Sequence, residues 1–249
     1  MIAFILAHAG GSASTYVPLF NHLASVVSFK PLDLPGHGLR ADEMLLGNMG
    51  DIIADVKERV HKVLDAAPDE SYVFLGHSMG TQLSFLLAMQ LEEEGRPPAH
   101  LYLSSGLVPG RHYIPNGFLE LCDTEFWEAC ADHFGGMSSD VVMSTDLQNL
   151  FVPILRADLR AIVEFVPPTE MGTGVPITVM WGDNEMMDAA DADIWRRHTT
   201  ADFRCHSLVG NHFHILQKPE AVEQIVLDSL LSILHEGSDS GMAGRQILK

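Results

Sequence analysis

The chain alternates short apolar runs with longer segments in which apolar residues recur at helical spacing. The apolar runs predict strands at Ile2–Leu6, Val26–Asp33, Tyr72–Leu75, His100–Ser104, Ile177–Trp181 and Phe203–Val209. The periodic segments predict helices at Val17–Ser25, 52–64 with Asp51 as its cap, Thr81–Glu94, Asp191–His198 and Pro219–His235. Strands that alternate with helices are typical of βαβ units. The pattern therefore predicts an α/β fold with a mainly parallel sheet flanked by helices.

A long stretch between the fourth and fifth predicted strands has no strand pattern. It carries many large apolar side chains, including Phe118, Trp127, Phe134, Phe151 and Leu155. These are too many for a solvated loop, although some of them complete the core. We therefore expect residues 107–172 to form a helical lid that covers the carboxyl edge of the sheet. One domain is expected over residues 1–236, followed by a poorly ordered tail at 237–249 that is rich in Ser, Asp and Gly.

Composition narrows the function classes. Of the 249 residues, 47% are hydrophobic and 19% are charged, which is typical of a globular protein with a sizeable core. The net charge of −18 argues against binding to nucleic acid and to an anionic membrane surface. Apolar runs stay well below the roughly 20 residues of a membrane span, and the start lacks a basic leader. We therefore expect a cytoplasmic protein.

The cysteines predict neither a disulfide framework nor a metal site. Their spacing matches no zinc pattern, and three is too few for a framework; they are Cys122, Cys130 and Cys205. Reduced thiols in a reducing compartment are the expected state. No cofactor is indicated by any motif in the chain.

The most informative motif is Gly76-His77-Ser78-Met79-Gly80, which fits G-x-S-x-G. A strand is predicted before it and a helix after it, which is the context that this motif has in α/β-hydrolases. There the serine lies on a strained turn, and side chains larger than glycine at the flanking positions would collide with the neighbouring strand and helix. Ser78 is thus the predicted nucleophile. The backbone N–H of Met79, at the start of the helix, is a predicted oxyanion donor.

A nucleophilic serine needs a base, which in this fold follows the serine and the acid along the chain. His212 lies on the loop after the last predicted strand and is our candidate among thirteen histidines. The nearby His214 raises the alternative of a metal site formed by both residues. No third ligand of a suitable type is evident, so we predict no metal.

The acid belongs on the loop after the fifth predicted strand, where three carboxylates compete. They are Asp183, Glu185 and Asp188. The usual position is three residues beyond the glycine, here Gly182, which favours Glu185 as the acid. Asp183 remains the alternative. A second oxyanion donor is expected from the turn after the first strand, where the tight glycines of His8-Ala9-Gly10-Gly11 favour the N–H of Ala9.

These segments together resemble the type II thioesterases that accompany nonribosomal peptide and polyketide synthases. The matching stretches are His8-Ala9-Gly10-Gly11-Ser12-Ala13 with Tyr16, Leu34-Pro35-Gly36-His37-Gly38 with Arg40, Gly76-His77-Ser78-Met79-Gly80, Ser104-Ser105-Gly106, and Gly210-Asn211-His212-Phe213. The chain departs from the family pattern where Ala7 replaces a proline, His37 an arginine and Glu185 an aspartate.

The resemblance implies an α/β-hydrolase core with a helical lid. The implied activity is hydrolysis of acyl groups from the phosphopantetheine arm of an acyl or peptidyl carrier protein, with Ser78 as nucleophile and His212 as base. Carrier proteins are typically acidic and so is this chain, so long-range attraction cannot drive their encounter. We expect a monomer. Neither the acyl group nor the pathway follows from the sequence.

Other functions on the same fold remain open from the sequence. One is a small-molecule carboxylesterase or lactonase, and another is an acyltransferase that passes the acyl group to an alcohol or amine. A non-catalytic ligand receptor is a third, but it would have no need of serine, base and acid together.

Overall fold

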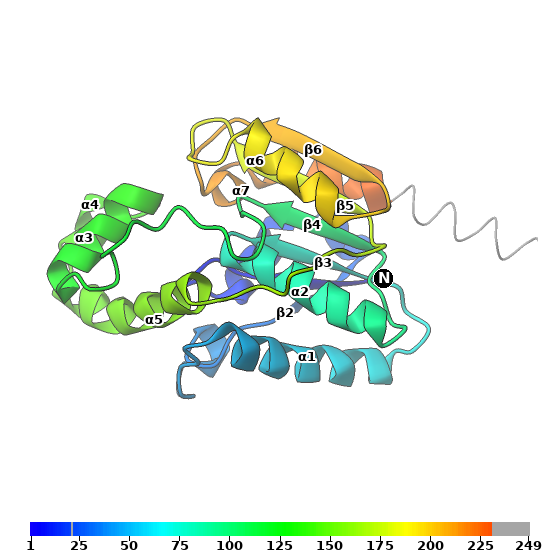
Figure 1. Cartoon of the computed structure of the whole chain (residues 1–249), viewed down its shortest axis with the longest axis horizontal. Coiled ribbons are helices and arrows are strands. Elements are labelled where there is room, and N and C mark those ends of the chain that lie inside the picture. The colour runs from blue at the N-terminus through cyan, green and yellow to red at the C-terminus, as the bar shows by residue number, and fades with distance from the viewer. Residues whose placement is uncertain (21, 231–249) are drawn as a thin grey trace, which may run out of the picture.

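A computed structural model of the chain describes residues 1–20 and 22–230. Its centre is a six-stranded, entirely parallel sheet with the strand order β2-β1-β3-β4-β5-β6 (Figure 1). The strands are β1 Ile2–Leu6, β2 Ser28–Pro31, β3 Tyr72–His77, β4 His100–Ser104, β5 Ile177–Gly182 and β6 Phe203–Leu208. The predicted α/β fold with its parallel sheet is confirmed, and the predicted strands match within a few residues at their ends.

Helices cover both faces of this sheet. The α-helices are α1 Met49–Ala66, α2 Met79–Glu93, α3 Asp123–Phe134, α4 Ser139–Val142, α5 Thr145–Val163, α6 Ala189–Ile194 and α7 His214–Gln217, and residues 219–230 are also helical. The 3-10 helices are η1 Ala13–Phe20, η2 Leu23–Ser25, η3 Gly38–Arg40 and η4 Trp195–His198.

The alternation of side chains along β1 shows how the core is divided. Phe4 and Leu6 pack with α1, α2 and α6 in one apolar cluster. Ala3 and Ile5 point to the other face, where they pack with η1, α7 and residues 219–230 in a second cluster. Because every residue of β1, β3, β4 and β5 is buried, these strands are continuous apolar runs, as central strands of a two-sided parallel sheet require.

Two local expectations were wrong. The segment Val17–Ser25 is not one α-helix but two 3-10 helices, of which the first begins earlier, at Ala13, and contains Pro18. Proline has no backbone N–H to donate, which disfavours a regular helix here. The cap of α1 is Asn48, whose side chain accepts a hydrogen bond from the backbone N–H of Asp51 at 2.9 Å, so Asp51 lies in the first turn instead of capping it.

The long connection between β4 and β5 holds α3, α4 and α5, all inside the range 107–172. In Figure 1 the green helices α3 and α4 stand apart from the sheet, opposite the carboxyl ends of its strands, and α5 runs back toward it. Ser138 caps α4 and Ser144 caps α5, which explains why the two helices begin where they do. We refer to the segment 107–172 as the cap. The predicted tail at 237–249 lies outside the described residues.

Two further findings bear on the expectations from composition. Within residues 1–20 and 22–230, no helix is long and apolar enough to cross a membrane. The cysteines are unpaired: Cys122 and Cys205 are exposed, whereas Cys130 is buried in the cap.

Candidate active site

Ser78 lies on the turn between β3 and α2. Its backbone has φ 54° and ψ −115°, a conformation that non-glycine residues rarely adopt and that is found at functional sites. The flanking glycines make this turn possible. A Cβ on Gly76 would lie 2.2 Å from the carbonyl oxygen of Gly80, and a Cβ on Gly80 would lie 2.2 Å from that of Leu6. The sequence thus folds here into a sharp strand–turn–helix in which only glycine fits beside the serine.

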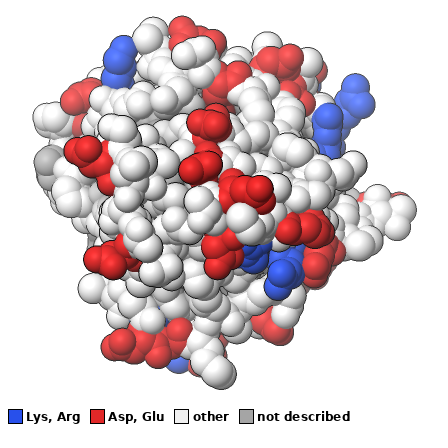
Figure 2. All heavy atoms as spheres, turned by 90° about the vertical axis from the view of Figure 1, so that its left-hand side faces the viewer, with Lys and Arg blue, Asp and Glu red and all other residues white. Residues whose placement is uncertain are grey.

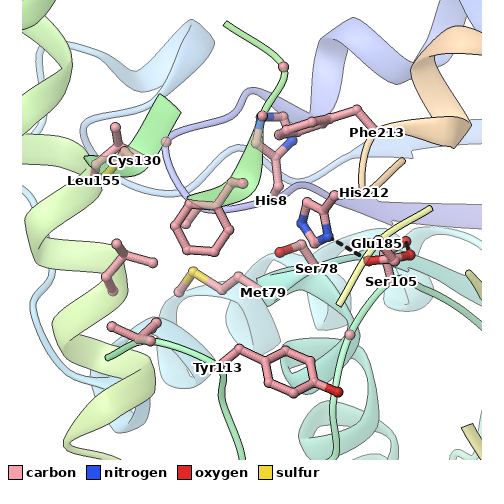
Figure 3. Close-up of a pocket in the computed structure, with 18 of the residues that line it drawn as sticks. His8, Ser78, Met79, Ser105, Tyr113, Cys130, Leu155, Glu185, His212 and Phe213 are labelled. Carbon is pink, nitrogen blue, oxygen red and sulfur yellow. Dashed lines mark hydrogen bonds and ion pairs between the residues drawn. The ribbon is translucent and has the colours of Figure 1, made fainter. Parts of the chain in front are cut away.

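His212 and Glu185 come together above Ser78. The Nδ1 atom of His212 lies 2.9 Å from Oε2 of Glu185, and the two side chains are 14% and 4% exposed. Figure 3 shows the His212 ring between the carboxylate and the Ser78 side chain, which points into the cavity. Three residues from the ends of β3, β5 and β6 thereby meet at one edge of the sheet, because parallel strands end at the same edge.

The Glu185 carboxylate is held ionised by its hydrogen bonds. Burial alone would raise its pKa, but hydrogen bonds from His212, from the Ser105 hydroxyl at 2.7 Å and from the Gly182 backbone N–H at 2.8 Å bring the pKa below its ordinary value. A charged carboxylate at this position fixes the orientation of the His212 ring and stabilises a positive charge on it.

The other two carboxylates of the same loop, Asp183 and Asp188, bind backbone N–H groups and not His212. Asp183 accepts a hydrogen bond from the backbone N–H of Gly210 at 3.0 Å and so ties the β5 loop to the loop that carries His212. Asp188 caps α6 by accepting from the backbone N–H groups of Ala190 and Asp191. The structure therefore places Glu185, and neither aspartate, against His212.

A chain of polar side chains continues behind Glu185. The Ser105 hydroxyl lies 3.3 Å from Nδ1 of His214, and the other ring nitrogen of His214 lies 3.3 Å from the Ser104 hydroxyl, which is 3.0 Å from Nδ1 of His77. Burial lowers the pKa of His214, and lowers that of His77 far below its ordinary value. These two rings are thus neutral, and His212 is the imidazole of this group that faces both a carboxylate and the pocket.

The two predicted oxyanion donors follow neighbouring strands of the sheet, Ala9 after β1 and Met79 after β3. Met79 is the first residue of α2, so its backbone N–H has no partner within the helix. Ala9 follows β1, whose end is paired with β3 in the register Leu6 to Gly76. Both residues line the same pocket as Ser78 and His212.

That pocket has a volume of about 410 Å³ and lies between the sheet and the cap. Arg111, His112 and Tyr113 bring polar groups to the first part of its cap side. The rest of the cap side is mainly apolar and includes Trp127, Cys130, Phe134, Met137, Val141, Phe151, Leu155, Leu159 and Ile162. The Met79 side chain reaches into it from below, as Figure 3 shows together with Cys130 and Leu155. A pocket of this size and lining suits an aliphatic chain, with its reactive end at Ser78.

No group of three or more His, Cys, Asp or Glu side chains is arranged to hold a metal ion among the residues that the structure describes. The ring of His214, the partner considered for such a site, is buried and turned to Ser104 and Ser105.

Comparison with known proteins agrees with this geometry. The thioesterase domain family matches residues 2–230 of the sequence. The chain belongs to the thioesterase family. It is 30% identical over 224 residues to a probable cadicidin biosynthesis thioesterase of Streptomyces griseus; the match covers 90% of this chain but 60% of that protein.

Solved structures extend the likeness of this thioesterase-family chain to type II thioesterases. The type II thioesterase BorB from the borrelidin biosynthetic cluster superposes with a TM-score of 0.77 and 28% identity, over 91% of each chain. ClbQ from the colibactin NRPS/PKS pathway superposes with a TM-score of 0.83 and 25% identity, over 93% of this chain and 97% of that one. The α/β-hydrolase fold inferred from the sequence is thereby confirmed.

Ser105 has a place in the site that the sequence does not predict, although it lies in the family-like segment Ser104-Ser105-Gly106. Ser105 has a φ of 52°, one of two positive values at non-glycine residues in the described chain, the other being that of Ser78. Its position directly after β4 could have marked it as a site residue, because β4 lies between β3 and β5, the strands that lead to Ser78 and Glu185. Its contact with Glu185, 80 residues later, was not visible without the fold.

Proposed function

We propose that the chain is a type II thioesterase, which removes acyl groups from the phosphopantetheine arms of carrier proteins in a polyketide or nonribosomal peptide pathway. The single observation that carries the proposal is the contact between His212 and Glu185 above the strained Ser78, at the polar end of an apolar pocket. Hydrolysis proceeds through an acyl-enzyme on Ser78. A monomeric, cytoplasmic enzyme is part of the proposal.

Each residue of the site has one part in the reaction. His212 accepts the proton of the Ser78 hydroxyl as the oxygen attacks the thioester carbonyl, and Glu185 stabilises the imidazolium that forms. The N–H groups of Met79 and Ala9 hold the oxyanion. The pantetheine thiol then leaves with the proton from His212. A water molecule, deprotonated by His212, releases the acyl group from Ser78 in the same way.

Charge supports a short-range mode of carrier docking. Figure 2 shows the face of the molecule at the cap end, where acidic side chains are spread widely and basic ones form a few small groups. A carrier domain, itself typically acidic, gains no long-range attraction from such a face. Recognition therefore depends on apolar contacts around the pocket mouth and on the arm itself.

The test compares matched substrates. Turnover of acyl-pantetheine and acyl-carrier thioesters is measured beside oxygen esters of the same acyl groups, with Ser78→Ala as the inactive control. We expect thioesters to be preferred and Ser78→Ala to lose activity by at least about 10⁴-fold.

Each other outcome identifies a different function. Equal rates on esters and thioesters would indicate a carboxylesterase or lactonase. Faster loss of substrate on addition of an alcohol or amine, with formation of the new ester or amide, would indicate an acyltransferase. Binding of acyl ligand without turnover, unchanged in Ser78→Ala, would indicate a receptor.

A further inference from the structure

Asp158, a buried carboxylate of the cap, contacts residues outside the cap, in the loops that follow β1 and β2. Oδ2 of Asp158, on α5, accepts a hydrogen bond from the backbone N–H of Gly10 at 2.7 Å and lies 2.9 Å from Nε2 of His37. The Asp158 side chain is 1% exposed, and its other oxygen, Oδ1, is buried with no hydrogen-bond partner among the described residues. A buried carboxylate is costly, so its contacts must be compensated.

The contact falls beside the proposed oxyanion donor, because Gly10 follows Ala9 directly in the turn after β1. Leu155, one helical turn before Asp158, packs on the same glycine: a Cβ on Gly10 would lie 2.8 Å from Cδ2 of Leu155. We call the turn formed by His8, Ala9, Gly10 and Gly11 the oxyanion turn. Helix α5 contacts this turn with the side chains of Asp158 and Leu155, and Leu155 also lines the pocket.

Other polar side chains of α5 bond within their own segment. Gln148 contacts Thr124, and Arg156 donates to the carbonyls of Leu119 and Leu121 and to Asp123. In the part of the chain that the structure describes, Asp158 is therefore the α5 residue that links the cap to the oxyanion turn by hydrogen bonds.

His37 is the side chain that can offset the charge that Asp158 brings close to the oxyanion site. Burial lowers the pKa of His37, but the hydrogen bond and charge of Asp158, the Pro35 carbonyl and the charge of Asp33 together raise it above its ordinary value. The neighbouring His8 has a pKa lowered by burial to about 4 and stays neutral. The contact with Asp158 favours protonation of His37, and a positive charge there offsets the negative charge of the carboxylate near the oxyanion site.

We propose that Asp158 is a positioning residue for the reaction. By accepting the hydrogen bond from the Gly10 N–H, Asp158 orients the N–H of the preceding Ala9. The oxyanion hole is therefore complete only when α5 contacts the turn after β1. An acyl chain that packs against Leu155 thereby favours the cap position in which hydrolysis proceeds. The inference rests on the proposed function in one respect, the role of the Ala9 amide.

The test uses Asp158→Ala, Asp158→Asn and the control Asp146→Asn, which makes the same exchange at an exposed position of the same helix. Asp158→Ala is expected to lower kcat about 10- to 100-fold with KM within about threefold, since misplacing a catalytic group by about 1 Å costs up to 10²-fold. Asp158→Asn still offers Gly10 an acceptor and is expected to recover most of kcat. Asp146→Asn is expected to match the unaltered enzyme.

The same variants are treated with a fluorophosphonate, which places a negative oxygen in the oxyanion hole when it labels Ser78. The labelling rate is expected to fall with kcat in Asp158→Ala, whereas the final labelled fraction measures how much protein is folded and competent. Each kcat value is divided by that fraction, so that only folded, competent protein is counted. Should Asp158→Ala show no cooperative unfolding, Asp158→Glu takes its place, because it keeps the charge beside His37 but displaces the acceptor from Gly10.

Three results would overturn the proposal: unchanged kcat and labelling rate, a higher KM with unchanged kcat, or no recovery in Asp158→Asn with an intact labelled fraction. Failure of the proposed function looks different. In that case the unaltered protein does not prefer thioesters, while the effect of Asp158 on ester turnover and on the labelling rate is still measurable, because both pass through the same oxyanion.

Discussion

The two walls of the pocket are built on different principles. The sheet wall carries Ser78, Glu185 and His212 on strand ends, where strained backbone and hydrogen bonds fix each side chain. The cap wall is formed mainly by apolar side chains of the cap, which pack against one another, while Arg156 and Asp158 of α5 make polar contacts. The difference teaches that the groups placed to react lie on the sheet wall, whereas the cap wall supplies apolar surface and, through Asp158, one contact with the turn after β1.

The largest expected effect tests which carboxylate acts with His212 on the sheet wall. Glu185→Ala should lower kcat about 10³- to 10⁴-fold, because His212 loses the group that orients it and stabilises its charge. Asp183→Ala removes only a hydrogen bond to the Gly210 backbone and should stay within about tenfold. Steady-state kinetics on one acyl thioester measures both. A large loss confined to Asp183→Ala would contradict the assignment of the acid.

A smaller effect on the same wall is expected from Ser105→Ala. The variant removes the hydrogen bond of 2.7 Å to Glu185, so kcat should fall about tenfold and the pKa of Glu185 should rise. Because the carboxylate is then protonated at higher pH, the titration of Glu185, followed by carboxyl-carbon NMR, should move to higher pH. Ser139→Ala, at the exposed start of α4, is the control and should leave this titration unchanged. An unmoved titration in Ser105→Ala would show that Ser105 does not act through Glu185.

On the cap wall, Cys130→Leu should change selectivity with little effect on chemistry. Cys130 is fully buried and lines the pocket, so a larger side chain shortens the space for the acyl chain. Each methylene excluded should cost about fourfold in kcat/KM, from roughly 0.8 kcal/mol of lost apolar burial. A series of acyl-pantetheines of increasing length measures the shift. Cys205→Leu, the same exchange at an exposed site on β6, should leave the preference unchanged.

The smallest expected effect comes from His100, which lies outside both walls at the amino end of β4. It concerns the loss of folding stability at low pH and not the loss of activity. Burial, assisted by the charge of Arg204, lowers the pKa of His100 to about 4. Between pH 6.5 and 4 the unfolded chain therefore binds a proton that the folded chain refuses, so stability falls as pH falls. At pH 5 this amounts to about 2 kcal/mol.

His100→Gln should accordingly lose less unfolding free energy between pH 7 and pH 5 than the unaltered protein, as measured by urea unfolding. His22→Gln is the opposite case. The hydrogen bond and charge of Glu223 raise the pKa of the exposed His22, so its contribution is present at low pH and is lost as pH rises through the raised pKa. Equal pH slopes in all three proteins would contradict this account.

The sequence by itself determined what depends on neighbours along the chain. Continuous apolar runs such as Ile2–Leu6 required a buried parallel sheet, and the glycines around Ser78 required a tight strand–turn–helix, because a Cβ has no room there. The spacing from Gly182 also favoured Glu185 over Asp183 as the acid. The structure places Glu185 against His212.

Only the tertiary structure decided what depends on distant segments. Ser105 and Glu185 are 80 residues apart in the chain, and Gly10 and Asp158 are 148 apart, yet each pair is joined by a hydrogen bond. The position of Ser105 after a strand marks it as a candidate, but its partner Glu185 is set by the order of strands in the sheet. No local pattern distinguishes Asp158 from an ordinary polar residue, because its partner Gly10 is brought to it by the folding back of the cap. Spacing along the chain predicts turns and periodicity; the convergence of strand ends and helix faces creates the site.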